Sequence, residues 1–508
     1  MIYVSEAWRD IQNRFLLNET FVEIDCTIAE VGIQDSATIV GNYEAAFSTS
    51  GGVLEGATKT NKYATCEHNL WALDGTLQIL PSMTPTENTG YISSIDGTGN
   101  LKINFPVLHT EASSGVTITW GSRFGEYPSI FTVTAKLGDT VVSETTVTDN
   151  TDQVSSVFSV MEDYDNIEVT VHTWCLPHRR VRIEKVIIGN VLTLRKDDLF
   201  DFTHTEIGHL NSGDLPKNSI EFTLDNTSGR WDPSNPNGME RYLAERQKMV
   251  VRYGLDIGDS IEWIPAGTFY LSEWRVPANG IEATFVARDV FEYLLNENYA
   301  GRRSGTLTDL ILDAFESAGT PGNFTYILSP ALDTYSATLP TGDYTCAEVV
   351  QMCANACECI IHQDRDGVLH IEPLDTLYTG EYVIGSALSY SHPEVELTKP
   401  LKSVSVSYGD DTYTLEVGIS GETQTVNNPL VGSIAQAESI AEWVKKTLNA
   451  RKIVSGEYRA DPRLDVFDLV AVEGKYGEIS PVAITEIVYS YTGSFKGRYK
   501  GRVLEVTG

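Results

Sequence analysis

The sequence has no run that approaches the ~18 consecutive apolar residues of a membrane-spanning helix. Its first residues, MIYVSEAWRD, have neither the basic start nor the apolar stretch of a secretory signal, so we expect synthesis in the cytosol. Basic residues are scarce: 37 Lys and Arg stand against 70 Asp and Glu, a formal net charge of −33. Proteins that wrap nucleic acid need clustered basic side chains, so this balance excludes that class. An acidic channel through which DNA slides without sticking stays compatible with it.

Catalytic motifs are also missing. The chain contains no GxSxG, no HExxH and no P-loop. Cys353, Cys357, Cys359 and His362 could be read as zinc ligands, but the first two lie one helical turn apart and the others follow in a strand. We therefore predict free buried thiols in a reducing compartment, and neither a metal nor a cofactor.

Alternation of apolar and polar residues is the dominant pattern. GVTITW, IFTVTAKL and IEVTV each place apolar side chains on one face, and turn-rich breaks separate them. Short alternating strands at this spacing predict a β-sandwich at about 41–180. A second β-rich block covers 181–300, and the strand-like run TFVEIDCTIAEV most simply pairs with it. The sandwich is then an insertion into a discontinuous first barrel, 1–40 and 181–300.

The chain changes character at 301–395, where we predict a small α/β domain. TLTDLILDAFESAG and TCAEVVQMCANAC each begin with a capping-box pattern and carry an apolar stripe, and CIIHQ-DRDG-VLHIEPL reads as a hairpin. The last block, 396–508, is predicted to be a second barrel with one long helix at 433–451, opened by Ser433 and Gln436. The fold class is therefore mainly β with a small α/β part.

The two barrel candidates resemble each other in sequence order. MVVRYGLDIGDSIEWIPAGTFYLSEWRVPANGIEATFVARD can be laid over DLVAVEGKYGEISPVAITEIVYSYTGSFKGRYKGRV. Both give, in this order, a strand, a polar loop, a proline (Pro265 or Pro481), a long strand, a turn with Gly and a final strand. This weak repeat predicts two similar β-barrels.

Two loops are candidate binding surfaces. GSRFGEYPS joins two predicted sandwich strands, and loops at the end of a sandwich often bind ligands. Its aromatic and charged side chains fit sugar recognition, and the candidate residues are Trp120, Arg123, Phe124, Glu126 and Tyr127. The second loop, LDNTSGRWDPSNPNG, sets Arg230 and Trp231 among turn formers. We expect these two residues to anchor an ordered loop at a subunit interface.

The order of several segments carries a resemblance to a known family. MIYVSEAWRDIQNRFLLNETFVEIDCTI, NLWALDG, FTLDNTSGRWDPSNPNG, WIPAGTFYLSEW and GVLHIEPL together resemble the tail-tip or baseplate hub proteins of phages and prophages, relatives of the tail-associated protein. Separately, ITW, EYPSIFTVTA, MEDYDNIEVTV and RRVRIEKVIIG resemble a galactose-binding-like jelly roll over 36–190.

The resemblance implies a structural virion protein at the distal end of the tail. It implies a homotrimer whose two barrels per copy imitate a sixfold ring, closing the lumen until DNA release. Its partners would be the distal tail protein or tube ring, the tape-measure protein, receptor-binding or fibre proteins, the passing genome DNA and, for the sandwich, a host surface glycan. Many such proteins continue into a fibre or a hydrolase, whereas this sequence stops at Gly508, so we expect no enzymatic activity.

Two alternatives stay open at this point. One is a soluble carbohydrate-binding protein or glycoside hydrolase, since acidic residues are plentiful, although nothing singles out an acid and a nucleophile. The other is a hexameric distal tail ring protein. The oligomeric state separates both from a trimeric hub.

Overall fold

The computed structural model describes most of the chain. The residues outside the description are 1, 15–16, 29–35, 58–62, 66, 69, 71–74, 76, 80–87, 110–112, 123–124, 233, 236–237, 240–241, 278–279, 322–323, 375–381 and 505–508. The chain divides into two compact units, which we call the main unit (Met1–Asp25, Thr193–Gly238 and Lys248–Gly508) and the inserted unit (Cys26–Leu192 and Met239–Gln247). Each is described by itself.

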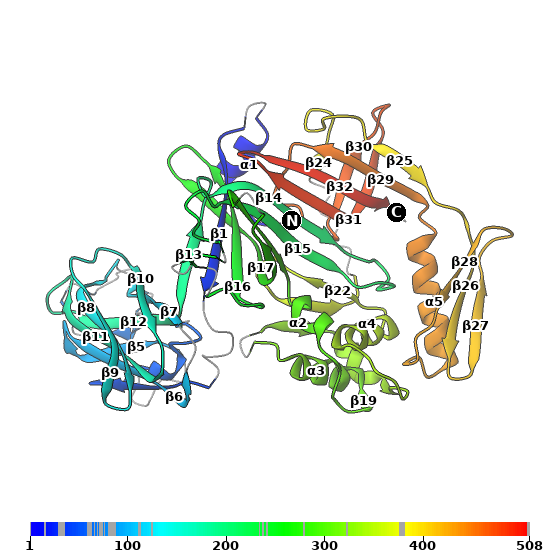
Figure 1. Cartoon of the computed structure of the whole chain (residues 1–508). Helices are drawn as coiled ribbons and strands as arrows, with labels where there is room; N and C mark the ends of the chain where they lie inside the picture. The colour runs from blue at the N-terminus through cyan, green and yellow to red at the C-terminus, as the bar shows by residue number, and fades with distance from the viewer. Residues whose placement is uncertain are drawn as a thin grey trace. The chain divides into compact units, whose positions relative to one another are not determined.

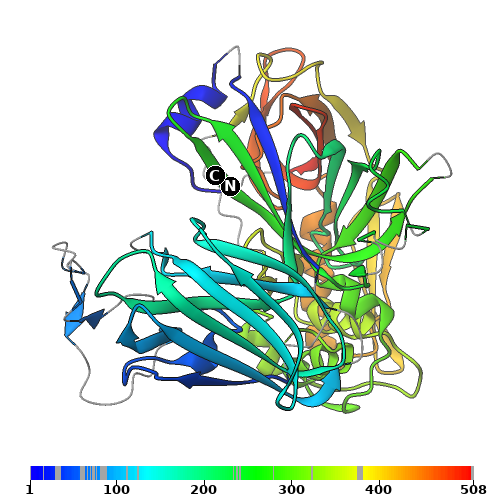
Figure 2. The ribbon, with the colours of Figure 1, turned by 60° about the vertical axis from the view of Figure 1, so that its left-hand side comes forward.

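The inserted unit consists of two main antiparallel sheets, blue to cyan in Figure 2. One has the order β10-β7-β12-β5 and the other β2-β6-β11-β8-β9. Alternating side chains fill the core, among them Val116, Ile118 and Trp120 of β7, which are fully buried. The bounds are β2 Thr38–Asn42, β5 Tyr91–Asp96, β6 Gly99–His109, β7 Ser113–Trp120, β8 Pro128–Leu137, β9 Thr140–Val147, β10 Val154–Met161, β11 Tyr164–Trp174 and β12 Arg180–Ile188. A short helix η1 (Ser50–Gly52) and a strand pair, β3 (Tyr63–Ala64) with β4 (Gln78–Ile79), complete it.

The main unit is built on one 13-stranded sheet (Figure 1). The strand order is β13-β1-β16-β17-β18-β15-β14-β31-β32-β29-β25, with β30 and β24 branching from β31. The bounds are β1 Thr20–Ile28, β13 Asn190–Leu194, β14 Leu199–Ile207, β15 Lys217–Asp225, β16 Lys248–Asp256, β17 Ile261–Arg275, β18 Glu282–Arg288, β24 Val383–Ile384, β25 Glu394–Leu397, β29 Lys452–Tyr458, β30 Leu469–Glu473, β31 Ile479–Tyr491 and β32 Phe495–Val503. The mainly β fold class predicted from the sequence is confirmed.

This sheet contains the same strand arrangement twice. We call β14–β18 the first module, and β25 with β29–β32 the second module. In each, the first strand pairs with the second, the second with the fifth, the fifth with the fourth and the fourth with the third, always antiparallel. The fourth strand carries the proline in both, and each ends ten residues later (275 − 265 = 10 and 491 − 481 = 10). The sequence repeat thus corresponds to a repeat in topology.

The two modules are joined into one sheet rather than closed as separate barrels. In the described part of the chain neither module pairs its first strand with its own third or fourth strand. Instead β14 of the first module pairs along 202–207 with 486–491 of β31 in the second. The edge of β14 that would close the first module into a barrel pairs with the second module instead. Backbone N–H and C=O groups at a buried edge need partners, and β31 supplies them.

A helical part follows the first module, green to yellow-green in Figure 1. The helices are α2 Phe291–Asn296, α3 Leu307–Ala318 and α4 Cys346–Ala356, and the strands are β19 Ser304–Thr306, β20 Tyr326–Leu328, β21 Ser336–Thr338, β22 Ile360–Gln363 and β23 Leu369–Glu372, with η4 at Pro330–Thr334. Both predicted capping boxes are present, on Thr306 with Asp309 and on Thr345 with Glu348.

A lobe interrupts the second module between its first and second strands. It holds β26 Leu401–Tyr408, β27 Asp411–Glu416, β28 Glu422–Val426 and the helix α5, Ile434–Leu448. The predicted helix at 433–451 is present but shorter, and Ser433 accepts a hydrogen bond from the Gln436 backbone. The three strands form a sheet of their own, β27-β26-β28, rather than extending the large sheet. Val404 and Val406 face α5 residues such as Ile440 in one buried cluster.

Outside the large sheet, α1 (Glu6–Gln12) lies near the chain start, with Ser5 as its N-cap. Among the described residues no helix has the length and hydropathy of a membrane span.

Candidate functional site: the junction of the two modules

The junction between β14 and β31 places polar side chains inside the main unit. His204, opposite Tyr489 in the ladder, is fully buried. Its Nδ1 lies 2.6 Å from the hydroxyl of Tyr253, and its Nε2 lies 2.8 Å from Oδ1 of Asn218 and 3.1 Å from Oε1 of Glu206. The alternation of β14 turns His204 and Glu206 inward, so a strand of one module supplies the polar groups that meet the other.

A guanidinium from the helical part completes this centre. Arg365 lies in the turn between β22 and β23 and is 5% exposed. It donates to the carbonyl oxygens of Pro462 and Leu464. Its Nη2 lies 3.3 Å from Oε1 of Glu206, and its Nε lies 3.8 Å from Oδ2 of Asp465. The hairpin tip therefore connects three parts of the main unit: the first module, the second module and the 461–465 loop.

Aromatic rings enclose the charge. The Arg365 guanidinium carbon lies 5.9 Å from the ring centre of Tyr253 and 5.5 Å from that of Tyr489. A cation over such faces is attracted by the ring quadrupole, more strongly when water is absent. The Tyr489 hydroxyl donates toward the carbonyls of Asp461 and Leu464, 2.9 Å and 2.8 Å away. We call His204, Glu206, Tyr253, Arg365, Asp465 and Tyr489 the buried polar centre.

Burial sets the protonation of this centre. It raises the pKa of Asp465 to about 7, reinforced by the Glu206 charge and opposed by Arg365. It lowers the pKa of His204 to about 3, and Arg365 adds to that effect. Burial alone would lower the pKa of Arg365, but Glu206 and Asp465 outweigh it and the net pKa is raised. Arg365 is thus a permanent cation and His204 a neutral hydrogen-bonding group at neutral pH.

The centre suits mechanical coupling rather than turnover. Apart from Asp465, whose side chain is 21% exposed, its side chains are enclosed, so the centre offers little surface to a substrate. A buried ion pair contributes little net stability when it is intact, but removing one partner costs ~3–5 kcal/mol of folding stability. Such a pair therefore favours one specific packing of the segments that supply it. Among the described residues, no group of three or more His, Cys, Asp or Glu is placed to hold a metal ion.

Sequence reasoning missed this centre. Arg365 was seen only as part of the DRDG turn, where a charged residue is ordinary. Glu206 and His204 fall in the predicted β-rich block 181–300, where the sequence did not single them out. Their roles depend on which strands meet, and one chain's local pattern carries no signal of that.

Several strand edges of the large sheet have no partner among the described residues: the outer edges of β13 and β24, and those of β25 and part of β17. β25 pairs with β29 on one side only, and all four of its residues are exposed, Val395 by 55% and Leu397 by 62%. On β17, residues 273–275 pair with β18 on one side and with no described strand on the other. Unpaired strand edges are templates for another chain.

The residues predicted for sugar contact lie mostly inside the sandwich. Trp120 is fully buried, and its Nε1 donates to Oγ of Ser155 at 2.8 Å. Glu126 is 1% exposed, and its carboxylate accepts from Trp174 Nε1 at 2.8 Å and from Arg179. Tyr127 is half-buried against the same core. Arg123 and Phe124 lie outside the described residues, so the sugar-binding assignment stays a prediction.

The second predicted loop is anchored within its own module. Trp231 is 5% exposed and packs edge to face on Phe285 of β18, with ring centres 5.2 Å apart. Asn226 holds the loop: its Oδ1 accepts from the Trp231 backbone at 2.8 Å and its Nδ2 donates to Gly280 at 2.9 Å. The Arg230 guanidinium lies 5.7 Å from the Trp231 ring. An interface role for these two residues stays a prediction.

Comparison with known proteins finds likeness of structure alone. No protein-family model matches this chain, and no curated protein matches it. It is similar to the tail protein from Neisseria meningitidis MC58, with 12% identity over 61% of this chain and 93% of that one and a TM-score of 0.45. It is also similar to the 43 kDa tail protein of prophage MuSo2 from Shewanella oneidensis, with 13% identity over 62% of this chain and 95% of that one and a TM-score of 0.43. For prophage tail protein gp18 from Listeria monocytogenes EGD-e, the identity is 12% over 62% of this chain and 91% of that one, and the TM-score is 0.40.

Proposed function

We propose that this chain is a structural, non-enzymatic protein of a phage-type tail tip, where three copies form a hub. The hub adapts a sixfold tube to a threefold tip and closes the lumen until DNA is released. The observation that carries this proposal is the repeated five-strand module: a chain with two alike modules offers six similar positions when three copies assemble.

The internal junction supports a closed ring. Within one chain, the first strand of the first module pairs with the second half of the fourth strand of the second module. The same step between chains would bring β25 of one copy to the second half of β17 in the next. Both of these strand edges lack a partner among the described residues. A head-to-tail contact of this kind generates a ring when its rotation closes.

The charge fits a conduit for DNA. A net charge of −33 repels phosphates, so a lumen lined by such subunits would let DNA pass without binding it. In this role the inserted unit would decorate the hub or meet a host glycan. The neighbours would be a distal tail or tube ring, the tape-measure protein and receptor-binding or fibre proteins.

Light scattering of the purified full chain tests the proposal. A hub gives a particle of three times the 56.0 kDa chain mass, with threefold symmetry in negative-stain images. A monomer favours a soluble carbohydrate-binding protein or glycosidase, and a hexamer favours a distal tail ring. If the chain trimerises only on its tube neighbour, images of that complex show threefold density. A chain that stays monomeric there contradicts the hub.

A further inference from the structure

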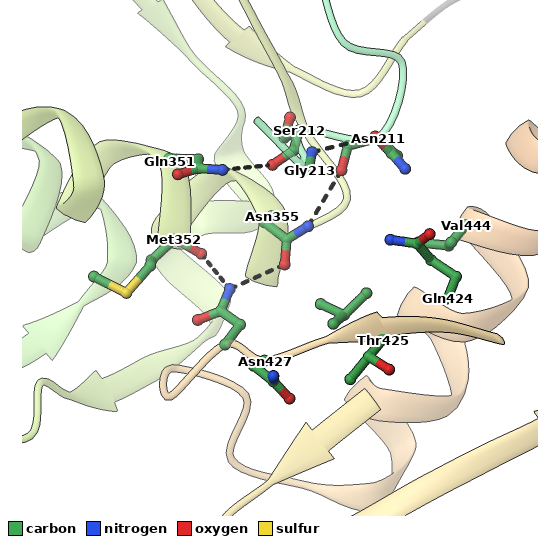
Figure 3. Close-up of a pocket in the computed structure, with 12 residues that line it drawn as sticks. Asn211, Ser212, Gly213, Gln351, Met352, Asn355, Gln424, Thr425, Asn427 and Val444 are labelled. Atoms are coloured by element: carbon green, nitrogen blue, oxygen red, sulfur yellow. Dashed lines mark hydrogen bonds between the residues drawn. The ribbon is translucent and has the colours of Figure 1, made fainter. Parts of the chain in front are cut away.

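A small pocket in the main unit is lined only by uncharged residues. It lies among the turn 211–213, the helix α4, the strand β28 with the residues after it, and the helix α5, and it encloses about 160 Å³. Figure 3 shows its walls. The lining residues are Asn211, Ser212, Gly213, Gln351, Met352, Asn355, Gln424, Thr425, Val426, Asn427, Asn428 and Val444. None of them is ionisable, in a chain where 107 residues (37 + 70) carry charge.

One set of amides builds the pocket. Asn428 Nδ2 donates to the Met352 carbonyl at 2.7 Å and to Oδ1 of Asn355 at 3.1 Å. Asn355 Nδ2 donates to the Asn211 carbonyl at 3.2 Å, and Gln351 Nε2 to the Ser212 carbonyl at 3.3 Å. Asn355 and Asn428 are buried. These bonds tie α4 to the 211–213 turn and to the segment after β28, so the pocket has a fixed shape.

A second set of side-chain amides lines the pocket and has donor groups without a hydrogen-bond partner among the described residues. The Gln424 amide makes no hydrogen bond to a described residue, and in Figure 3 it points from β28 toward the wall that holds Asn211 and Asn355. Asn427 uses only its oxygen, which accepts from Ser407 at 3.0 Å, and Asn211 uses its side-chain oxygen for Gly213 at 3.2 Å. Their Nδ2 groups remain as donors. Each amide offers a donor beside an acceptor.

We propose that this pocket binds one neutral sugar residue. Adjacent hydroxyls present a donor and an acceptor side by side, which matches a side-chain amide. Met352, Val426 and Val444 add apolar surface for the C–H groups of a sugar ring. At roughly 30 Å³ per water the space holds about five waters, comparable to one monosaccharide.

Other ligand classes fit less well. A charged ligand would lose hydration without meeting an opposite charge. An apolar ligand would displace water from the exposed Gln424 and Asn427 amides without replacing their hydrogen bonds. A metal ion would find no carboxylate, imidazole or thiolate among the lining residues. The proposal does not depend on the oligomeric state or on the hub role.

Saturation-transfer NMR on the full chain tests the site, with glucose, galactose and N-acetylglucosamine as probes and glucosamine and glucuronate as charged counterparts. We expect at least one neutral sugar to bind and the charged analogue to bind more weakly. Gln424→Leu and Asn427→Leu keep side-chain size and remove the amide, so each should weaken binding about tenfold, a loss of about 1.4 kcal/mol.

Thr412→Val is the matched control, because Thr412 belongs to β27 in the same sheet and does not line the pocket. It should bind as the unchanged chain does. The inference is overturned if none of the three neutral sugars binds, if the charged analogues bind equally well, or if both Leu variants bind normally. The last result would place sugar binding elsewhere, for example at the 121–129 loop.

Discussion

Nη2 of Arg365 lies 3.3 Å from Oε1 of Glu206, and both side chains are almost completely buried. The arginine comes from a hairpin tip of the helical part, and the glutamate comes from the strand that joins the two modules. The contact therefore links two segments that are distant in sequence.

Replacing this arginine tests the joint. Arg365→Met should destabilise the main unit by ~3–5 kcal/mol, because the buried Glu206 carboxylate is left without its cation. Urea unfolding monitored by tryptophan fluorescence measures it. Arg498→Met is the control: Arg498 pairs with Glu486 at the surface, and the loss should be ~0–1 kcal/mol. Equal effects of the two variants would show that the buried centre does not couple the modules.

The buried centre also predicts a pH effect. The pKa of Asp465 is raised to about 7 in the folded chain, above its ordinary value of 3.8. The folded state therefore holds a proton that the unfolded state releases, so this group's contribution is present below about pH 4 and is lost as pH rises to about 7.

Asp465→Asn removes that contribution from the pH profile. Relative to the unchanged chain, the variant should gain stability as pH rises from about 4 to about 7. His204 affects both proteins alike: its pKa is lowered to about 3, so its contribution is lost as pH falls below about 6.5. Urea midpoints of the two proteins across this range provide the comparison. A constant difference would mean that Asp465 is ionised throughout.

The anchored loop separates folding from assembly. Trp231→Ala should cost ~3–5 kcal/mol, because it removes a buried ring packed on Phe285. Arg230→Ala should leave thermal unfolding of the isolated chain nearly unchanged and weaken the trimer, if the loop faces a neighbour. Thermal unfolding and light scattering of both variants measure the two effects. A trimer that is indifferent to Arg230 would remove the loop from the interface.

The edge strand gives the sharpest test of the proposed ring. Val395→Lys places a charge on an unpaired edge, which discourages pairing with another strand, so it should shift the trimer toward monomers. Val395 is 55% exposed, and Val141 of the inserted unit is 51% exposed, so Val141→Lys is a matched control. Sedimentation at several concentrations compares them. Trimers of equal stability would mean that β25 is not the contact.

Local features of this fold could be read from the sequence, and long-range ones could not. The capping boxes on Thr306 and Thr345 depend on residues three positions apart, so their pattern is visible in the chain. The proline-bearing strands β17 and β31 showed the repeat for the same reason. The pairing of β14 with β31 depends on which edges meet, and alternation of side chains looks the same in either partner.

The surroundings of the predicted sugar-binding residues could not be read from the sequence either, and their sugar-binding role stays a prediction. Trp120 and Glu126 have side chains typical of a sugar site. Alternation along β7 turns Trp120 into the core, and Glu126 is buried there as the partner of Arg179. The amide pocket brings together residues from four separated segments. No window of sequence holds more than a few of them.

The lobe inserted between β25 and β29 distinguishes the two modules, because β14 and β15 of the first module are linked only by 208–216. In the proposed assembly every second position around the circle would bear a protrusion and its neighbours would not. A partner of sixfold symmetry would then meet two kinds of binding position, three with the lobe and three without it. Attachments below the hub would therefore number three, although the tube above repeats six times.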